Sequence, residues 1–232
     1  MSARSPVYIE TGAKRLFACS LEWPGLCRAA KTEEAALLAL SGYTGRYAAV
    51  AARAGARFDP GPPAGWEVVE RVPTRSGGAD FGVPTTVLER DHRPVSGEEA
   101  ARTSALLTAA WELFDEVVAS APESLRKGPR GGGRDRDAIV GHVAAAEQMF
   151  AQRVGLKLEV PGPGDRAVIE ANRAAILDWC RSGQPVATAR PGWPPRYAAR
   201  RLLWHVLDHA WEIEDRSPEI EDGPPEIEDG RQ

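Results

Sequence analysis

Strand-like patterns of apolar residues occupy the first third of the chain. Three segments rich in β-forming residues predict strands: VYIET (7–11), RLFACSLEW (15–23) and WEVVERV (66–72). The dipeptide Pro24-Gly25 indicates a turn. Thr32 can cap a helix that begins at Glu33 and runs through AALLAL towards Ala54.

From Ser96 onwards the apolar residues recur with a helical period. Ser96 and Glu99 form the pattern of a capping box. One face of the helix that follows carries Leu106, Ala110, Leu113, Phe114 and Val117. Three more amphipathic helices are predicted, which follow Asp135–Asp137, follow the capping residue Asp165, and run from about Pro195 to Asp215.

Together these patterns predict an α+β fold, in which a small sheet-plus-helix module precedes an antiparallel four-helix bundle. We divide the chain into four parts: the module (1–72), a connector (73–95), the bundle (96–216) and an acidic tail (217–232). The connector mixes glycine, proline and charged residues. We therefore expect few contacts to cross it and the two parts to fold separately.

Three of the four histidines lie on the inward faces of predicted helices. Leu202, His205, His209 and Ile213 form one apolar stripe, and His142 lies in a second stripe with Ile139 and Val143. His205 and His209 are one helical turn apart, so both rings lie on the same side of the helix. Together with His142 from a facing helix, they form a candidate metal site with three nitrogen ligands.

An HxxxH pair alone is often two ordinary histidines, and a single histidine on an apolar face is a weaker signal still. Three imidazoles directed into one core are harder to explain without a ligand. Each would cost roughly 1–3 kcal/mol if it were buried without a partner. Three nitrogen ligands also leave coordination positions free for water or substrate, as in a catalytic site.

The segments DAIVGHVAAAEQMF and RYAARRLLWHVLDHAWEIEDR resemble the DinB-like family of metal-binding helical bundles. The resemblance covers about residues 96–216. The family pattern is one histidine in the second helix and HxxxH in the fourth, and His142, His205 and His209 match it in order. The family includes thiol-dependent isomerases and transferases, so the resemblance implies a bound metal and a low-molecular-weight thiol as cofactors.

A site with three imidazole ligands can bind several metal ions, and nearby charged residues could contact the ligands or a substrate. Three imidazoles suit Zn or Ni first, with Fe or Cu as alternatives. Arg201 could contact a substrate at the edge of the site, and Asp208 or Glu212 could accept a hydrogen bond from an imidazole N–H. A solvated helix flank explains these three charged residues equally well.

The stretch LEWPGLCRAAKTEEAALLAL resembles the PGC-x-T-x-EEA signature of HicB-like antitoxin domains. The resemblance covers residues 5–72 and implies a small sheet packed on one helix. It departs at the central cysteine, because Leu26 stands there and the cysteine follows as Cys27. Antitoxins of this family bind DNA through a separate domain, whose place the predicted bundle takes here. We therefore interpret the module as a docking or dimerising element.

The net charge and the length of the apolar runs indicate which partners the protein can bind. The net charge is −4, of which the last sixteen residues contribute −5, so the remaining 216 residues are near +1 and give no footprint for nucleic acid. No apolar run approaches the ~20 residues that span a bilayer, and MSARSPVYIETG lacks the apolar core of a signal peptide. We expect a cytoplasmic protein, a homodimer, that acts on a small molecule.

The three cysteines, Cys19, Cys27 and Cys180, are odd in number and include no CxxC pair. We expect buried or half-buried reduced thiols.

Two functions remain open at this point. One is a metal-dependent enzyme, a transferase, isomerase or hydrolase that acts on a small molecule with a thiol. The other is a non-catalytic metal-binding stress-response protein whose N-terminal module contacts a partner. A fourth protein ligand would favour the second function, and an acid–base residue beside the metal would favour the first.

The acidic tail repeats the motif EIED with a period of seven, as EIEDRSP, EIEDGPP and EIEDGRQ from Glu212 onwards. Each copy has one apolar residue, too little to offset the entropy of ordering, so we expect the last two copies to be a disordered extension. Truncation after Ser217 should leave the melting temperature and the metal content unchanged. Calorimetry and metal analysis of the truncated protein check this, and a large fall in either would mean that the tail docks on the body.

Overall fold

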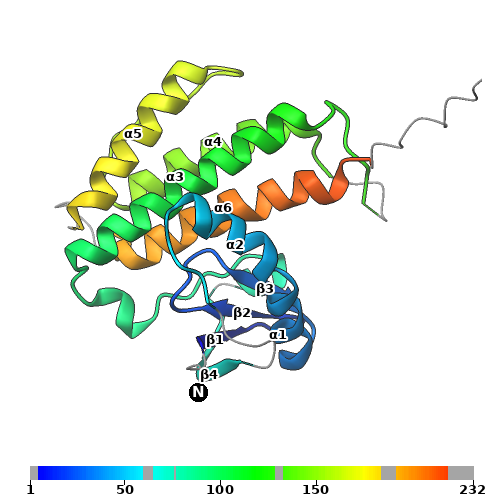
Figure 1. Ribbon diagram of the computed structural model, residues 1–232, viewed down its shortest axis with the longest axis vertical. Coiled ribbons are helices and arrows are strands. Elements are labelled where there is room, and N and C mark those ends of the chain that lie inside the picture. The colour runs from blue at the N-terminus through cyan, green and yellow to red at the C-terminus, as the bar shows by residue number, and fades with distance from the viewer. Residues whose placement is uncertain (1–4, 60–64, 76, 129–132, 184–191, 219–232) are drawn as a thin grey trace, which may run out of the picture.

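A computed structural model describes residues 5–59, 65–75, 77–128, 133–183 and 192–218. The last two copies of the acidic repeat, residues 219–232, lie outside the described residues. A four-stranded sheet with two helices forms one side of the molecule, and four long helices form the other (Figure 1). The α+β class expected from the sequence is confirmed. No helix among the described residues is long and apolar enough to cross a membrane.

The sheet has the strand order β3-β2-β1-β4. Its strands are β1 (Ser5–Thr11), β2 (Leu16–Ser20), β3 (Cys27–Ala30) and β4 (Trp66–Pro73). Strands β1, β2 and β3 pair antiparallel in a meander, whereas β4 pairs parallel to β1. The sequence did not predict β3, because CRAA has four residues and no β-branched or aromatic side chain. Its pairing with β2 makes it a strand.

Alternate side chains of the sheet enter two separate clusters. Val7, Ile9 and Ala18 belong to the main core, together with residues of the two helices that follow β3. On the opposite face Tyr8 and Phe17 pack with Leu88, Trp204 and other residues. This alternation follows from the two-residue period of a strand, and it means that both faces of the sheet are covered.

Two helices replace the single helix that the sequence predicted between Glu33 and Ala54. Helix α1 (Glu33–Gly42) begins at Thr32, whose side chain accepts a hydrogen bond from the Ala35 backbone N–H. Helix α2 (Thr44–Arg53) follows after Tyr43. The expected cap is confirmed and the continuous helix is wrong. The break falls at Ser-Gly-Tyr-Thr-Gly, where two glycines weaken the helix.

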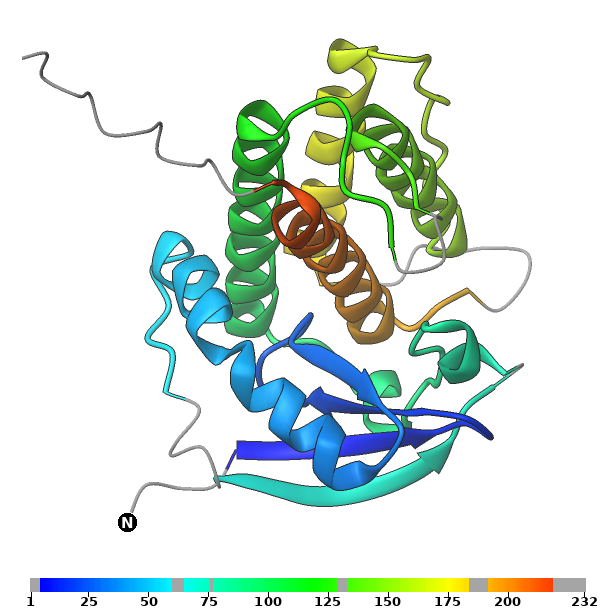
Figure 2. The same cartoon turned by 90° about the vertical axis from the view of Figure 1, so that its right-hand side faces the viewer.

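The four long helices are α3 (Gly97–Ser120), α4 (Arg136–Arg153), α5 (Arg166–Ser182) and α6 (Pro195–Arg216). Ser96 caps α3 and Asp165 caps α5, as the sequence indicated. Helix α6 packs against both α3 and α4, and α5 packs against the same two helices. Figure 2 shows α6 between the sheet and the other long helices.

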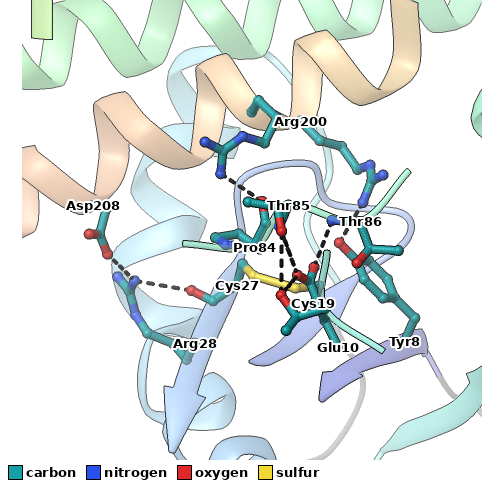
Figure 3. Close-up of a disulfide and its surroundings, with 12 residues drawn as sticks. Tyr8, Glu10, Cys19, Cys27, Arg28, Pro84, Thr85, Thr86, Arg200 and Asp208 are labelled. Carbon is teal, nitrogen blue, oxygen red and sulfur yellow. Dashed lines mark hydrogen bonds and ion pairs between the residues drawn. A yellow bond between two sulfur atoms is a disulfide. The ribbon is translucent and has the colours of Figure 1, made fainter. Parts of the chain in front are cut away.

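The connector is not a loose linker. It contains two short 3-10 helices, η1 (Gly78–Phe81) and η2 (Glu89–His92). The carboxylate of Glu10, which is fully buried on β1, accepts hydrogen bonds from the Thr74 hydroxyl and from the backbone N–H groups of Thr85 and Thr86. These bonds hold the connector against the sheet (Figure 3).

The sheet and the long helices share one hydrophobic core, contrary to the expectation of few contacts between them. The main cluster includes Ile9 of β1, Tyr47 of α2 and Trp211 of α6. Ion pairs cross the same boundary, with N–O distances of 2.9 Å for Arg28–Asp208, 2.5 Å for Arg46–Asp215 and 2.5 Å for Arg53–Glu116. Separate folding of the two parts would expose this shared apolar surface to water.

The expectation of three reduced cysteines is wrong for two of them. Cys19 on β2 and Cys27 on β3 occupy directly opposed positions of the antiparallel pair, with Cα atoms 4.2 Å apart, and they form a disulfide (Figure 3). Their spacing gave no hint of this, because the pairing depends on the unpredicted strand β3. Cys180 is a free, buried thiol, and burial raises its pKa to about 12.

Gly25 couples the turn after β2 to helix α6. Its φ angle is 93°, and a Cβ atom placed there would lie 3.0 Å from the Cβ atom of Leu203 and 3.1 Å from its backbone carbon. The close approach of this turn to α6 therefore requires glycine.

We expect Gly25→Ala to destabilise the protein by about 1–3 kcal/mol, through backbone strain and contact with α6. Gly45→Ala is the matched control, because Gly45 lies inside α2 and its new Cβ would meet nothing within 4 Å. This control should leave the stability unchanged or raise it slightly, because alanine favours a helix more than glycine does. Urea unfolding of both variants measures the difference, and equal stabilities would contradict the close approach.

Candidate metal centre

Helices α4 and α6 bring the three histidines together. His142 lies on α4, and His205 and His209 lie one turn apart on α6. One ring nitrogen from each histidine can be chosen so that all three nitrogens lie within 4.8 Å of one another. The ring centroids are 4.6–5.0 Å apart. The group could hold a metal ion.

The distance between His142 and His205 suits shared ligation. Their Nε2 atoms are 3.2 Å apart. Two nitrogens bound to one tetrahedral ion at ~2.0–2.1 Å per bond lie roughly 3.3 Å apart, so little movement is needed to accept an ion. A hydrogen bond between one protonated and one unprotonated Nε2 would give a similar distance. The two interpretations differ in whether the protein takes up metal.

His209 is oriented by a chain of charged groups. Its Nδ1 atom lies 2.8 Å from Oε2 of Glu212, and Arg216 donates a hydrogen bond of 2.6 Å to the other carboxylate oxygen. Arg216 in turn donates to the backbone carbonyl of Arg126. Hydrogen bonds from His209 and Arg216 lower the pKa of Glu212. With Nδ1 directed at a carboxylate, Nε2 of His209 is the free ligand atom, as in many metal sites.

His205 is the most deeply buried member of the group. Its side chain is 7% exposed, and among the described residues its Nδ1 atom has no hydrogen-bond partner. Burial, with smaller contributions from His209 and His142, lowers its pKa to about 2. Burial also lowers the pKa of His142. Both rings are therefore neutral near pH 7, which is the form that binds metal.

Arg201 lies beside the histidines but is held in the protein interior. It is buried, it donates a hydrogen bond of 2.6 Å to the carbonyl of Pro84, and its guanidinium lies over the rings of Phe150 and Trp204. The ring of Phe150 also contacts His205, with centroids 5.5 Å apart. Arg201 thus forms part of the wall behind the site, and the structure ties its guanidinium to Pro84.

Asp208 faces the sheet. Its carboxylate accepts a hydrogen bond of 2.9 Å from Arg28 on β3 (Figure 3). The guanidinium of Arg28 lies 3.5 Å from the ring centroid of Tyr43 and also donates to the carbonyl of Cys27. Asp208 therefore links α6 to the sheet, whereas Glu212 is the residue that contacts an imidazole. His92 is exposed on η2 and does not belong to the group.

Within the described part of the chain, the cluster of possible metal ligands has three members, all histidines. A three-nitrogen set leaves at least one coordination position for an exogenous ligand. Sequence reasoning missed the role of Arg216 in orienting Glu212. The signal was available, because Arg216 follows Glu212 by four residues on the same helix.

The chain matches no family model, no curated protein and no solved structure.

The contact between Glu212 and His209 yields a prediction. Replacing the carboxylate in Glu212→Gln should weaken metal binding about 10–100-fold, because the imidazole loses its charged acceptor and its orientation. Glu214→Gln is the matched control on the same helix, since Glu214 is exposed and its ion pair with Arg46 is long, at 3.9 Å. Competition with a chromophoric chelator measures both affinities. Equal affinities would show that Glu212 does not support the site.

Proposed function

We propose that this chain is a DinB-like protein that binds one divalent metal ion at His142, His205 and His209 and uses it in an enzymatic reaction on a small molecule. In this proposal the four long helices form the family's four-helix bundle. The observation that carries the proposal is the meeting of three imidazoles from α4 and α6 in one group that could hold a metal ion.

Two features of the described residues are compatible with metal binding by the histidines. The Nε2 atoms of His142 and His205 are as close as two ligands of one ion. His209 has the carboxylate contact that commonly orients a metal-binding imidazole.

The three-histidine set favours an enzyme because it leaves coordination positions for reactants. A divalent ion bound only by neutral imidazoles keeps its full positive charge, so it lowers the pKa of a water or thiol that completes its coordination. The chain's own groups orient His209 through Glu212, and Phe150 supplies an apolar wall beside His205. From the family resemblance, we propose that the reaction is a transfer, an isomerisation or a hydrolysis that uses a low-molecular-weight thiol. Zn or Ni is the ion we propose first, with Fe or Cu as alternatives.

A non-catalytic metal-binding protein is the second candidate. The observation in its favour is that, among the residues the structure describes, no carboxylate or cysteine joins the three histidines as an acid or base. The sheet, with α1 and α2 beside it, would then serve as the HicB-like docking or dimerising element. The response of the site to thiols separates the two candidates.

The test begins with metal content. The purified protein should contain about one divalent ion per chain, and His142→Ala should lose it, because two imidazoles on α6 bind far more weakly than three. His92→Ala is the matched control, since His92 is exposed and lies outside the cluster. Full metal content in the His142 variant would show that the assignment of the metal site is wrong.

The second part of the test uses the protein reconstituted with Co(II). Addition of a small thiol should change the visible spectrum as sulfur enters the coordination sphere, and azide should compete with it. A spectrum that responds to neither ligand would show a closed site. The non-catalytic function would then replace the enzymatic one.

A further inference from the structure

A cavity lies between the sheet and the long helices, away from the histidines. It has a volume of about 300 Å³, in the range of small-molecule pockets. The turn after β2, the helix η2 and the first turns of α3 and α6 enclose it. On α6 it is lined by Arg196, Ala199 and Arg200. Arg200 precedes His205 by five residues, about 140° around the helix, so the cavity and the histidines use different faces of α6.

The lining of this cavity is rich in arginine. Five arginines and three acids contribute to it, namely Arg90, Arg93, Arg102, Arg196 and Arg200 with Glu22, Asp91 and Glu99. The excess is two positive charges. Apolar lining comes from Leu21, Pro24 and Leu106. Charge and apolar surface together suit an organic anion.

One of the arginines, Arg196, uses all its donors within the protein. Arg196 pairs with both carboxylate oxygens of Glu99 and donates to the backbone carbonyls of Arg90, Arg93 and Pro94. Arg196 therefore holds η2 against α3 and shapes one wall of the cavity.

Arg200 uses only some of its hydrogen-bond donors within the protein. It donates to the Tyr8 hydroxyl at 2.6 Å (Figure 3). It also donates to the Asp91 carboxylate at 2.5 Å. Asp91 is itself buried and also accepts from the backbone N–H of Leu88. The Nε atom of Arg200 is buried and has no partner among the described residues. Leaving such a donor unpaired is costly, so an acceptor is expected there.

Beyond the ion pairs of Arg196 with Glu99 and of Arg200 with Asp91, the lining keeps three arginines and Glu22, and Arg90 and Arg102 are two of these arginines. Within the described ranges, neither guanidinium is in an ion pair or a hydrogen bond with a protein group. Arg102 is nevertheless held in place, because its guanidinium lies 4.1 Å from the ring centroid of Trp23. A guanidinium stacked on an aromatic ring keeps its N–H edge free for an oxyanion, and its planar fork matches carboxylate or phosphate oxygens.

We propose that this cavity is a binding site for a small organic anion that presents a carboxylate or phosphate group to Arg102 and Arg90. The apolar part of the ligand lies against Leu21 and Leu106. Carboxylate and phosphate share the recognition chemistry of an arginine fork, and the experiment below distinguishes them. The site does not depend on the metal centre, because it uses other residues on another face of α6.

The experiment titrates the full-length protein, stripped of metal and dialysed, with inorganic phosphate and separately with succinate. Sodium chloride at equal ionic strength serves as the reference, because general screening acts alike in all three salts. Calorimetry gives the dissociation constant, and the indole N–H resonance of Trp23 gives the location, since Trp23 lies under Arg102.

The expected result is saturable binding of one of the two anions, with a shift of the Trp23 resonance. Arg102→Gln should weaken anion binding on the order of tenfold or more. Arg102→Lys keeps the charge but not the planar fork, so its affinity should lie between those of the unchanged protein and Arg102→Gln. Arg153→Gln is the matched control, because Arg153 is exposed at the end of α4 and does not line the cavity. If Arg102→Gln fails to fold, Arg90→Gln replaces it.

The anion that binds more tightly identifies the head group of the ligand. Absence of saturation by either anion up to about 50 mM, well above a millimolar dissociation constant, would overturn the proposal. Equal weakening by Arg102→Gln and Arg153→Gln would also overturn it, because binding would then follow net charge alone. Use of the metal-stripped protein keeps the outcome separate from that of the metal test.

Discussion

The burial of helix α6 between the sheet and the other long helices is the constraint on which most of this structure depends. Leu203, Leu207 and Trp211 on α6 are almost completely removed from water, and they contribute to a core that reaches from the strands to α3 and α4. Each such side chain stabilises the fold by roughly 1.5–3 kcal/mol. Since α6 also provides His205 and His209, its position in the core sets the position of the candidate metal site.

The same burial explains the chemistry available at the site. An imidazole removed from water is disfavoured in its charged form, so the pKa values of His142 and His205 fall and both rings are neutral. Neutral rings offer lone pairs to a metal, and the ring of Phe150 packs against His205. Desolvation is therefore a cost of the fold that also keeps these two rings in the neutral form, which is the form that can bind a metal.

The contacts of each charged residue on α6 depend on the face of the helix on which it lies. Asp208 pairs with Arg28 and ties the helix to β3, whereas Glu212 orients His209. Arg200 pairs with Asp91 and Tyr8 beside the arginine-lined cavity, and Arg201 donates a hydrogen bond to Pro84 behind the histidines. Four charged residues within thirteen positions thus have four different surroundings. The helical period alone distributes them around the axis.

The sequence pattern was sufficient to predict the elements that form through interactions between nearby residues. The caps at Thr32, Ser96 and Asp165, the strands around Val7 and Trp66, and the stripe that places His205 above His209 are all properties of nearby residues. The helical period also placed His142 on an inward face. The candidate metal ligands could therefore be selected before their distances were known, because each helix shows which of its faces is apolar.

What the sequence could not determine were the contacts between elements distant in the chain. Strand β3 exists through its pairing with β2, and that pairing brings Cys19 opposite Cys27. The buried Glu10 draws the connector onto the sheet, so a segment that reads as a linker becomes part of the fold. The arginine-lined cavity joins residues from both ends of the chain. Periodicity reports which face of an element is buried, but only packing decides which other element covers it.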